Sequence, residues 1–290
     1  MSYRPSMSVR LGVESLADRL VPSVTFQEDT AAHTLTLTAA QHQNNTVAIT
    51  NDGNGGLRVT ADGVTRTFTG VTFVAVFTGD GADTVTYTQG SATHEVDIRR
   101  NFGLQVHLGD NASGTTDRFT ANVFGDVGFF QNGAWQARTL GLIVNGDGGH
   151  DRIAVNANHD TDVRPGSILF ISLEGNEGND YITADYDGEL DGKLDFLATG
   201  DQDNDLVAAN FHLDAGSSGS VISTDDTSGA AGVEGNLGND NLTFAVRLAA
   251  GATAQVNAFI DGGFNLFDHD VGHRTANVRS AFLETDFVIQ

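Results

Sequence analysis

A turn that recurs about every 30 residues constrains the fold of this chain more than any other feature. Each copy begins with Gly and then Asp or Asn, reaches a second Asp a few residues later, and enters a β-branched or aromatic stretch. The clearest copies are V-N-G-D-G-G-H-D-R-I-A-V from Val144, L-E-G-N-E-G-N-D-Y-I-T-A from Leu173, A-T-G-D-Q-D-N-D-L-V-A-A from Ala198 and V-E-G-N-L-G-N-D-N-L-T-F from Val233. Looser copies begin at Phe77, Leu108 and Ile260. Such a period is the sequence signature of stacked repeats.

The spacing of the copies indicates the kind of repeat. The leading glycines are Gly79, Gly109, Gly146, Gly175, Gly200, Gly235 and Gly262, and they are separated by 25 to 37 residues. This period suits three short strands with their turns and is short for a propeller blade of roughly 40 residues or more. Segments between the turns, such as T-V-T-Y-T after Asp83, alternate as strands do. An all-β fold is therefore predicted, in which residues 71–290 form a parallel β-helix (solenoid) of about seven irregular coils. Its core column contains Val85, Ile153, Ile182, Val207 and Leu242.

The residues before 71 follow other patterns. Residues 24–70 contain the alternating runs T-L-T-L-T, T-V-A-I-T, L-R-V-T and T-R-T-F-T, joined by N-D-G-N-G-G and A-D-G. Asp-Gly and Asn-Gly between alternating runs predict an antiparallel β-meander, which would cover the open end of the first coil. Residues 1–23 place Val9, Val13, Leu16 and Leu20 on one face before Pro22. This spacing predicts an amphipathic N-terminal helix.

Composition excludes several classes of protein. The formal net charge is −23, which disfavours binding to the phosphates of nucleic acid. No apolar run approaches the roughly 18 residues that a transmembrane helix needs. The chain has no Cys, so disulfides, thiolate metal sites and cysteine nucleophiles are impossible. Its 39% hydrophobic content is that of a folded interior and not of a disordered acidic tail.

Stacked turns would align their acidic residues in columns. One predicted column is Asp83, Asp117, Asp151, Asp180, Asp205 and Asp240; the other is Asp80, Asp110, Asp147, Asn176, Asp201 and Asn236. Carboxylates about 5 Å apart repel by roughly 0.8–3 kcal/mol, and bound cations or turn N–H groups would offset this. Both readings stay open: these residues and Asp203 ligate Ca²⁺, or each Asp caps its own turn.

The turn pattern G-[DN]-x-G-x-D-x-hydrophobic resembles the nonapeptide of repeats-in-toxin (hemolysin-type) calcium-binding proteins. The copies at 175–182 and 235–242 resemble it most, followed by 146–153. The resemblance implies Ca²⁺ held by turn Asp residues and backbone carbonyls. The nonapeptides are not in tandem here, so the family's own site cannot be copied directly. The shorter pattern Asp187, Glu189, Asp191-Gly192 begins like an EF-hand loop, but Ala198 stands where Glu is required, so a solvated acidic loop is expected.

The segment R-L-G-V-E-S-L-A-D-R-L-V-P-S (10–23) resembles an N-terminal segment of planctomycete surface and exported proteins. Ala17 stands where an acidic residue is usual. The resemblance implies a secreted or cell-surface location. The alternative is that these residues are only an amphipathic cap on the β-helix.

Three functions are consistent with these features. The favoured one is an exported structural or adhesive surface protein whose Gly-Asp turns bind Ca²⁺, with a cell-surface polysaccharide as a partner. A polysaccharide lyase or hydrolase is the alternative enzyme, although no catalytic motif separates two carboxylates from the turn columns. The third is a self-assembling fibre subunit that associates through its solenoid ends.

Overall fold

The computed structural model describes residues 23–111, 115–224, 230–263, 271–276 and 280–283. Strands and their connections make up this part of the chain, and it contains no helix. Consequently no helix in the described ranges could cross a membrane. The amphipathic helix predicted for the first 23 residues falls on residues 1–22, outside the described residues.

Two large sheets hold almost all of the strands. Sheet A contains β1 (Val24–Asp29), β2 (Thr34–Ala39), β6 (Phe73–Phe77), β8 (Phe102–His107), β12 (Thr139–Asn145), β14 (Ile168–Glu177), β16 (Lys193–Gln202), β18 (Ser220–Ile222), β19 (Ala231–Leu237), β21 (Gln255–Asp261) and β23 (Ser280–Leu283). Sheet B contains β3 (Thr46–Asn51), β4 (Gly56–Ala61), β5 (Val64–Thr69), β7 (Thr84–Gln89), β9 (Arg118–Val123), β13 (Arg152–Ala157), β15 (Tyr181–Gly188), β17 (Leu206–Leu213), β20 (Asn241–Leu248) and β22 (Val271–Ala276). A separate hairpin consists of β10 (Phe129–Gln131) and β11 (Ala134–Gln136).

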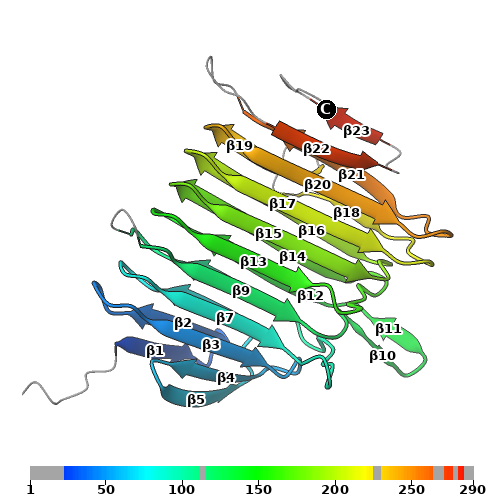
Figure 1. Cartoon of the computed structure of the whole chain (residues 1–290). Coiled ribbons are helices and arrows are strands. Elements are labelled where there is room, and N and C mark those ends of the chain that lie inside the picture. The colour runs from blue at the N-terminus through cyan, green and yellow to red at the C-terminus, as the bar shows by residue number, and fades with distance from the viewer. Residues whose placement is uncertain (1–22, 112–114, 225–229, 264–270, 277–279, 284–290) are drawn as a thin grey trace, which may run out of the picture.

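The chain alternates between the two sheets as it advances. Most strands of sheet A are followed by a strand of sheet B, as in β12–β13 and β14–β15, and we call each such pair a repeat; β1 and β18 are instead followed by another strand of sheet A. Successive repeats pair in parallel in both sheets, so that Leu142 of β12 lies between Leu104 of β8 and Ile171 of β14. Figure 1 shows the strands of sheet B side by side, from blue β3 to red β22. The chain is therefore all-β with parallel sheets, which is compatible with the predicted β-helix.

The third strand expected in each repeat is reduced to single bridges. Ile98, Val127, Val163 and Leu190 pair in parallel from one repeat to the next, outside any named strand. All four side chains are fully buried. This short third face closes the gap between a sheet B strand and the next sheet A strand.

The parallel sheets begin earlier than residue 71. The antiparallel pairs predicted within residues 24–70 are present as β1–β2 and β3–β4–β5. In addition, β2 pairs in parallel with β6, and β3 pairs in parallel with β7. The alternating runs at β2 and β3 thus belong to the first repeat, with β1, β4 and β5 added at its outer edge.

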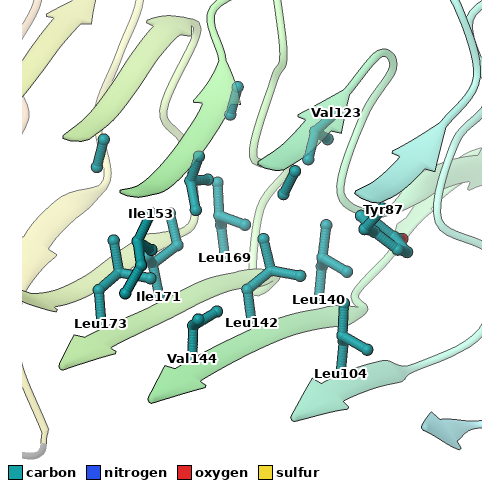
Figure 2. Packing of buried hydrophobic residues seen from close by; sticks show 14 of the residues in the cluster. Tyr87, Leu104, Val123, Leu140, Leu142, Val144, Ile153, Leu169, Ile171 and Leu173 are labelled. Atoms are coloured by element: carbon teal, nitrogen blue, oxygen red, sulfur yellow. The ribbon is translucent and has the colours of Figure 1, made fainter. Parts of the chain in front are cut away.

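The core lies between the two sheets and follows the register. The predicted column of Val85, Ile153, Ile182, Val207 and Leu242 is confirmed, because these residues align through the pairings of sheet B and are all fully buried. On the facing sheet, rows such as Leu104, Leu142 and Ile171 point into the same interior (Figure 2). Because a shift of one residue would move these side chains out of the core, the burial fixes the register of the strands and therefore the position of the turns between them.

Candidate functional site

The recurring turns lie where a strand of sheet A ends and the next strand of sheet B begins. In each of six repeats an aspartate holds the last position before the sheet B strand: Asp83, Asp117, Asp151, Asp180, Asp205 and Asp240. Because the following residues pair in register, for example Arg152 with Tyr181, the six aspartates form one file along the stack. The first predicted column is therefore present, and we call it the aspartate ladder.

A hydrogen bond joins each rung of the aspartate ladder to the next. The backbone N–H of Asp83 donates to Oδ1 of Asp117 at 2.5 Å, and the N–H of Asp117 donates to Oδ1 of Asp151 at 3.2 Å. The same bond links Asp151 to Asp180, Asp180 to Asp205 and Asp205 to Asp240, each at 2.7 Å. All six residues are at most 3% exposed. The side chains therefore connect repeats inside the protein, in addition to shaping their own turns.

The leading glycine of a repeat makes room for the ladder aspartate five residues later. A Cβ built on Gly146 would lie 2.7 Å from Oδ2 of Asp151, which is closer than real Cβ atoms approach. At Gly175, Gly200 and Gly235 the ladder oxygen of the same repeat lies closer still. The G-x-x-x-x-D spacing is thus a packing requirement of the corner between the sheets.

The repeats β6–β7 and β8–β9 do not follow the glycine alignment predicted from the sequence. By register, Thr78 and Leu108 hold the position of Gly146, because Phe77 pairs with His107 and His107 pairs with Asn145. Gly79 and Gly109 lie one position later. Both have positive φ values, 80° and 87°, so glycine there serves a left-handed backbone and not a carboxyl contact.

This next position forms an outer file with left-handed backbone throughout. Asp147, Asn176, Asp201 and Asn236 have φ values between 66° and 76°, which Asp and Asn tolerate better than other side chains. These four match the second predicted column. Asp80 and Asp110 do not, because they lie one position farther along, and Asp110 pairs with Gly148. The shift arises because the glycine of these two repeats stands at the second position of the turn and not at the first.

The outer file is partly exposed and linked by side-chain contacts. Nδ2 of Asn236 donates to Oδ1 of Asp201 at 2.9 Å, and the Thr199 hydroxyl donates to Oδ2 of Asp201 at 3.0 Å. Oδ2 of Asp147 accepts the backbone N–H of Gly109 at 3.1 Å. Asp203, the remaining predicted calcium ligand, is exposed beside this file and also has positive φ, 74°.

A second ladder, made of asparagines, was not predicted from the sequence. Asn179, Asn204 and Asn239 directly precede three ladder aspartates. The backbone N–H of Asn204 donates to Oδ1 of Asn179, and that of Asn239 donates to Oδ1 of Asn204, both at 2.9 Å. Asn179 and Asn204 thus serve the following repeat, whereas the ladder aspartates from Asp117 to Asp240 serve the preceding one. The recurring dipeptide N-D at 179–180, 204–205 and 239–240 is the sequence signal that marks both ladders.

The ladder carboxyls are all buried, and in most of them one of the two oxygens lacks a hydrogen-bond partner among the described residues. Oδ2 of Asp151, Asp180 and Asp205 has no hydrogen-bond partner in the described part of the chain. Burial raises the pKa of Asp151 and Asp180 to about 8, and the pKa of Asp205 to about 7. Burial likewise raises the pKa of Asp117 to about 7. Buried ionised carboxylates would each cost several kcal/mol, so burial favours the protonated form of these groups.

Asn45 shows what the leftover oxygen does when it carries a proton. Asn45 continues the file by one repeat: it is 1% exposed, and its backbone N–H donates to Oδ1 of Asp83 at 2.5 Å. Its Nδ2 donates to the carbonyl of Thr78 in the next repeat at 3.3 Å. The equivalent carbonyl beside Asp151 is that of Gly175, and a Cβ built on Gly146 would lie 2.6 Å from its oxygen and 2.7 Å from Oδ2 of Asp151. A proton on Oδ2 of Asp151 would supply a donor at the position that Nδ2 holds in Asn45.

A charged cluster on the third face was also missed by the sequence analysis. Arg164 Nη2 lies 2.6 Å from Asp126 Oδ2 and 2.6 Å from Asp162 Oδ2, and Trp135 of the β10–β11 hairpin packs over its guanidinium at 4.5 Å. Burial raises the pKa of Asp162 to about 6. Asp126 and Trp135 come from the repeat before that of Asp162 and Arg164, so only part of the cluster is local in the sequence. The arrangement neutralises carboxylates under the hairpin.

The packing of Gly175 against Asp180 gives a first prediction. Replacing Gly175 with Ala inserts a Cβ into the space of the Asp180 carboxyl and the Gly200 carbonyl. We expect the free energy of unfolding to fall by about 1–3 kcal/mol, measured by urea denaturation. Gly141→Ala is the matched control, because a Cβ there meets nothing closer than 3.9 Å. Equal stability of the two variants would contradict the packing argument.

The raised pKa values give a second prediction. The ladder acids bind protons more tightly when folded than at the unfolded value of 3.8, so their contribution is complete below about pH 4 and is lost as pH rises through 7 to 8. Asp180→Asn keeps the acceptor and cannot titrate. Between about pH 4 and pH 8, the free energy of unfolding of this variant should therefore fall less steeply with pH than that of the original chain. The difference in slope is about 1.4 kcal/mol per pH unit.

Urea denaturation at a series of pH values measures this slope. Asp160→Asn is the control, because Asp160 is exposed and lies outside the ladder. We expect the control to retain the slope of the original chain. A chain whose stability rises from pH 5 to pH 8 would show that the ladder carboxyls are ionised.

Comparisons with protein-family models, with curated proteins and with solved structures find no match. What is known of the chain therefore comes from its own geometry. The two parallel sheets and the buried ladder at their corner are its defining features.

Proposed function

We propose that this chain is an exported structural or adhesive protein of the cell surface, built as a parallel β-helix of about seven irregular coils. The observation that carries the proposal is the aspartate ladder. It runs through six repeats with every side chain at most 3% exposed. Such a core makes the β-helix a rigid support, and the buried turn residues serve its structure. The partly exposed outer file is then the surface that contacts partners.

The location in this proposal is supported by the N-terminal segment. Residues 10–23 resemble the segment of planctomycete surface and exported proteins, and a net charge of −23 suits a protein that stays soluble outside the cell. A cell-surface polysaccharide is the partner we assign to it. Self-association through the ends of the β-helix is the proposed route to longer assemblies.

Deleting residues 1–23 tests the location. If the segment directs export, the shortened chain expressed in a planctomycete host should accumulate inside the cell, while the full chain reaches the surface or the medium. Immunoblots of cell fractions measure the distribution. Unchanged export of the shortened chain would leave the segment with a capping role only.

Calcium belongs to the outer surface in this proposal. The ladder oxygens are enclosed, whereas Ca²⁺ takes six to eight oxygen ligands and usually some water. Asp201 and Asp203 lie at the solvent-facing edge of the turns, next to Asn236. We therefore assign calcium binding to the outer file and its exposed neighbours.

Thermal unfolding tests the calcium assignment. Millimolar Ca²⁺ should raise Tm by a few degrees relative to chelator, because a ligand that binds only the folded state stabilises it. The double variant Asp201→Asn/Asp203→Asn should lose most of this shift, and Asn tolerates the positive φ at both positions. Asp160→Asn serves as the control. The same Tm with Ca²⁺ and with chelator would remove calcium from the proposal.

One cleft favours a second candidate, action on a polysaccharide. It has a volume of about 520 Å³ and is lined by Asp80, Asp110 and Asp147 together with Phe77 and His107. Phe77 is 41% exposed and stacks on His107 at 5.2 Å. An exposed aromatic face beside carboxylates suits a sugar ring. Turnover of a polysaccharide by the purified chain would favour this candidate over a purely structural role.

A further inference from the structure

A mixed cluster of one histidine and two aspartates lies at the C-terminal ends of β15 and β17 in sheet B. The aspartate ladder lies at the opposite, N-terminal ends of these strands. Nδ1 of His212 is 2.8 Å from Oδ1 of Asp187 and 3.8 Å from Oδ1 of Asp214. One ligand atom from each residue lies within 4.8 Å of both others. Around one metal ion with bonds of about 2.0–2.2 Å, ligand atoms are separated by roughly 3–4 Å. The separations between the ligand atoms of the cluster, from 2.8 Å to at most 4.8 Å, include this range.

The fold holds these three residues in place. Asp187 was expected in an acidic loop, but it lies in β15 and pairs in register with His212 of β17. Asp214 follows β17 and keeps the pairing, because its backbone N–H donates to the carbonyl of Gly188 at 3.0 Å. The neighbours of His212, Phe211 and Leu213, are buried. The ligand backbone is thus fixed by sheet pairing and core packing.

We propose that Asp187, His212 and Asp214 bind a divalent transition-metal ion of the Zn²⁺ type. The imidazole decides the class of ion, because Zn²⁺ and its neighbours accept nitrogen and oxygen ligands together, whereas Ca²⁺ and Mg²⁺ prefer oxygen alone. The side chains are 47%, 47% and 40% exposed. Water completes the coordination, and the affinity is that of an open surface site. This site is separate from the calcium sites proposed above.

The neighbouring repeat sets the local charge. Arg247 of β20 pairs in register with His212 from the other side, and Asp185 lines the same small groove. Asp185 accepts a hydrogen bond from Nδ2 of Asn210 at 3.2 Å. Arg247 therefore brings a positive charge to the groove that His212 also lines. Removing that charge should strengthen metal binding, which a purely structural ion pair does not predict.

Titration calorimetry of the full chain with Zn²⁺ at pH 7.5, without chelator, tests the proposal. We expect a site that is lost, or at least tenfold weaker, in His212→Ala. Asp187→Asn and Asp214→Asn should each weaken binding, and Arg247→Gln should tighten it severalfold. Excess Ca²⁺ should not compete. All substituted side chains are at least partly exposed, and thermal unfolding confirms that each variant is folded.

His42→Asn is the matched control. His42 pairs with a single carboxylate, that of Asp80, and has no third ligand in the described part of the chain, so its replacement should leave the Zn²⁺ site intact. Absence of Zn²⁺ binding by the original chain would overturn the proposal. Equal affinity and stoichiometry in the original chain and in His212→Ala would also overturn it, since the bound ion would then lie elsewhere.

Discussion

The hydrogen bond from a backbone N–H to the aspartate of the next repeat is the interaction on which the corner between the sheets depends. At this corner the chain leaves the hydrogen-bonding pattern of one sheet before it joins the other. A buried N–H without a partner there would cost about 1–3 kcal/mol. The aspartate supplies the acceptor, and the glycine five residues earlier leaves room for it. Where Asn precedes the ladder Asp, two consecutive backbone N–H groups of the same turn each have a side-chain acceptor in a neighbouring repeat.

The neutral state of the ladder follows from the same geometry. A file of ionised carboxylates in the interior would combine desolvation with mutual repulsion. Protonation removes both costs and leaves the carbonyl oxygen as an acceptor. Asn45, at the head of the file, is the amide equivalent of that state. The acidic composition of the chain therefore overstates the charge that it carries when folded.

Much of the architecture could be predicted from the sequence, because the turn motif and the alternation of apolar residues carry register information. The parallel sheets, the core column from Val85 to Leu242 and the file of six aspartates all follow from aligning the repeats. The alignment failed where the glycine of a turn serves a different position: Gly79 and Gly109 were placed one position early. Burial of the aspartates was not predicted, since capping and ion binding both use Asp in a turn. The Arg164 cluster and the His212 cluster join residues from different repeats, and no local pattern reports such contacts.

The opposite directions of the two ladders have a consequence for how such a chain can change in length. Where the dipeptide N-D recurs, a unit such as that of Asn204 and Asp205 offers an asparagine oxygen to its successor and an aspartate oxygen to its predecessor. A duplicated unit inserted between two others therefore brings the acceptors that both new junctions need, and a deleted unit takes its own away. In this part of the stack, growth or shortening by a whole unit keeps an acceptor for both peptide groups of each turn.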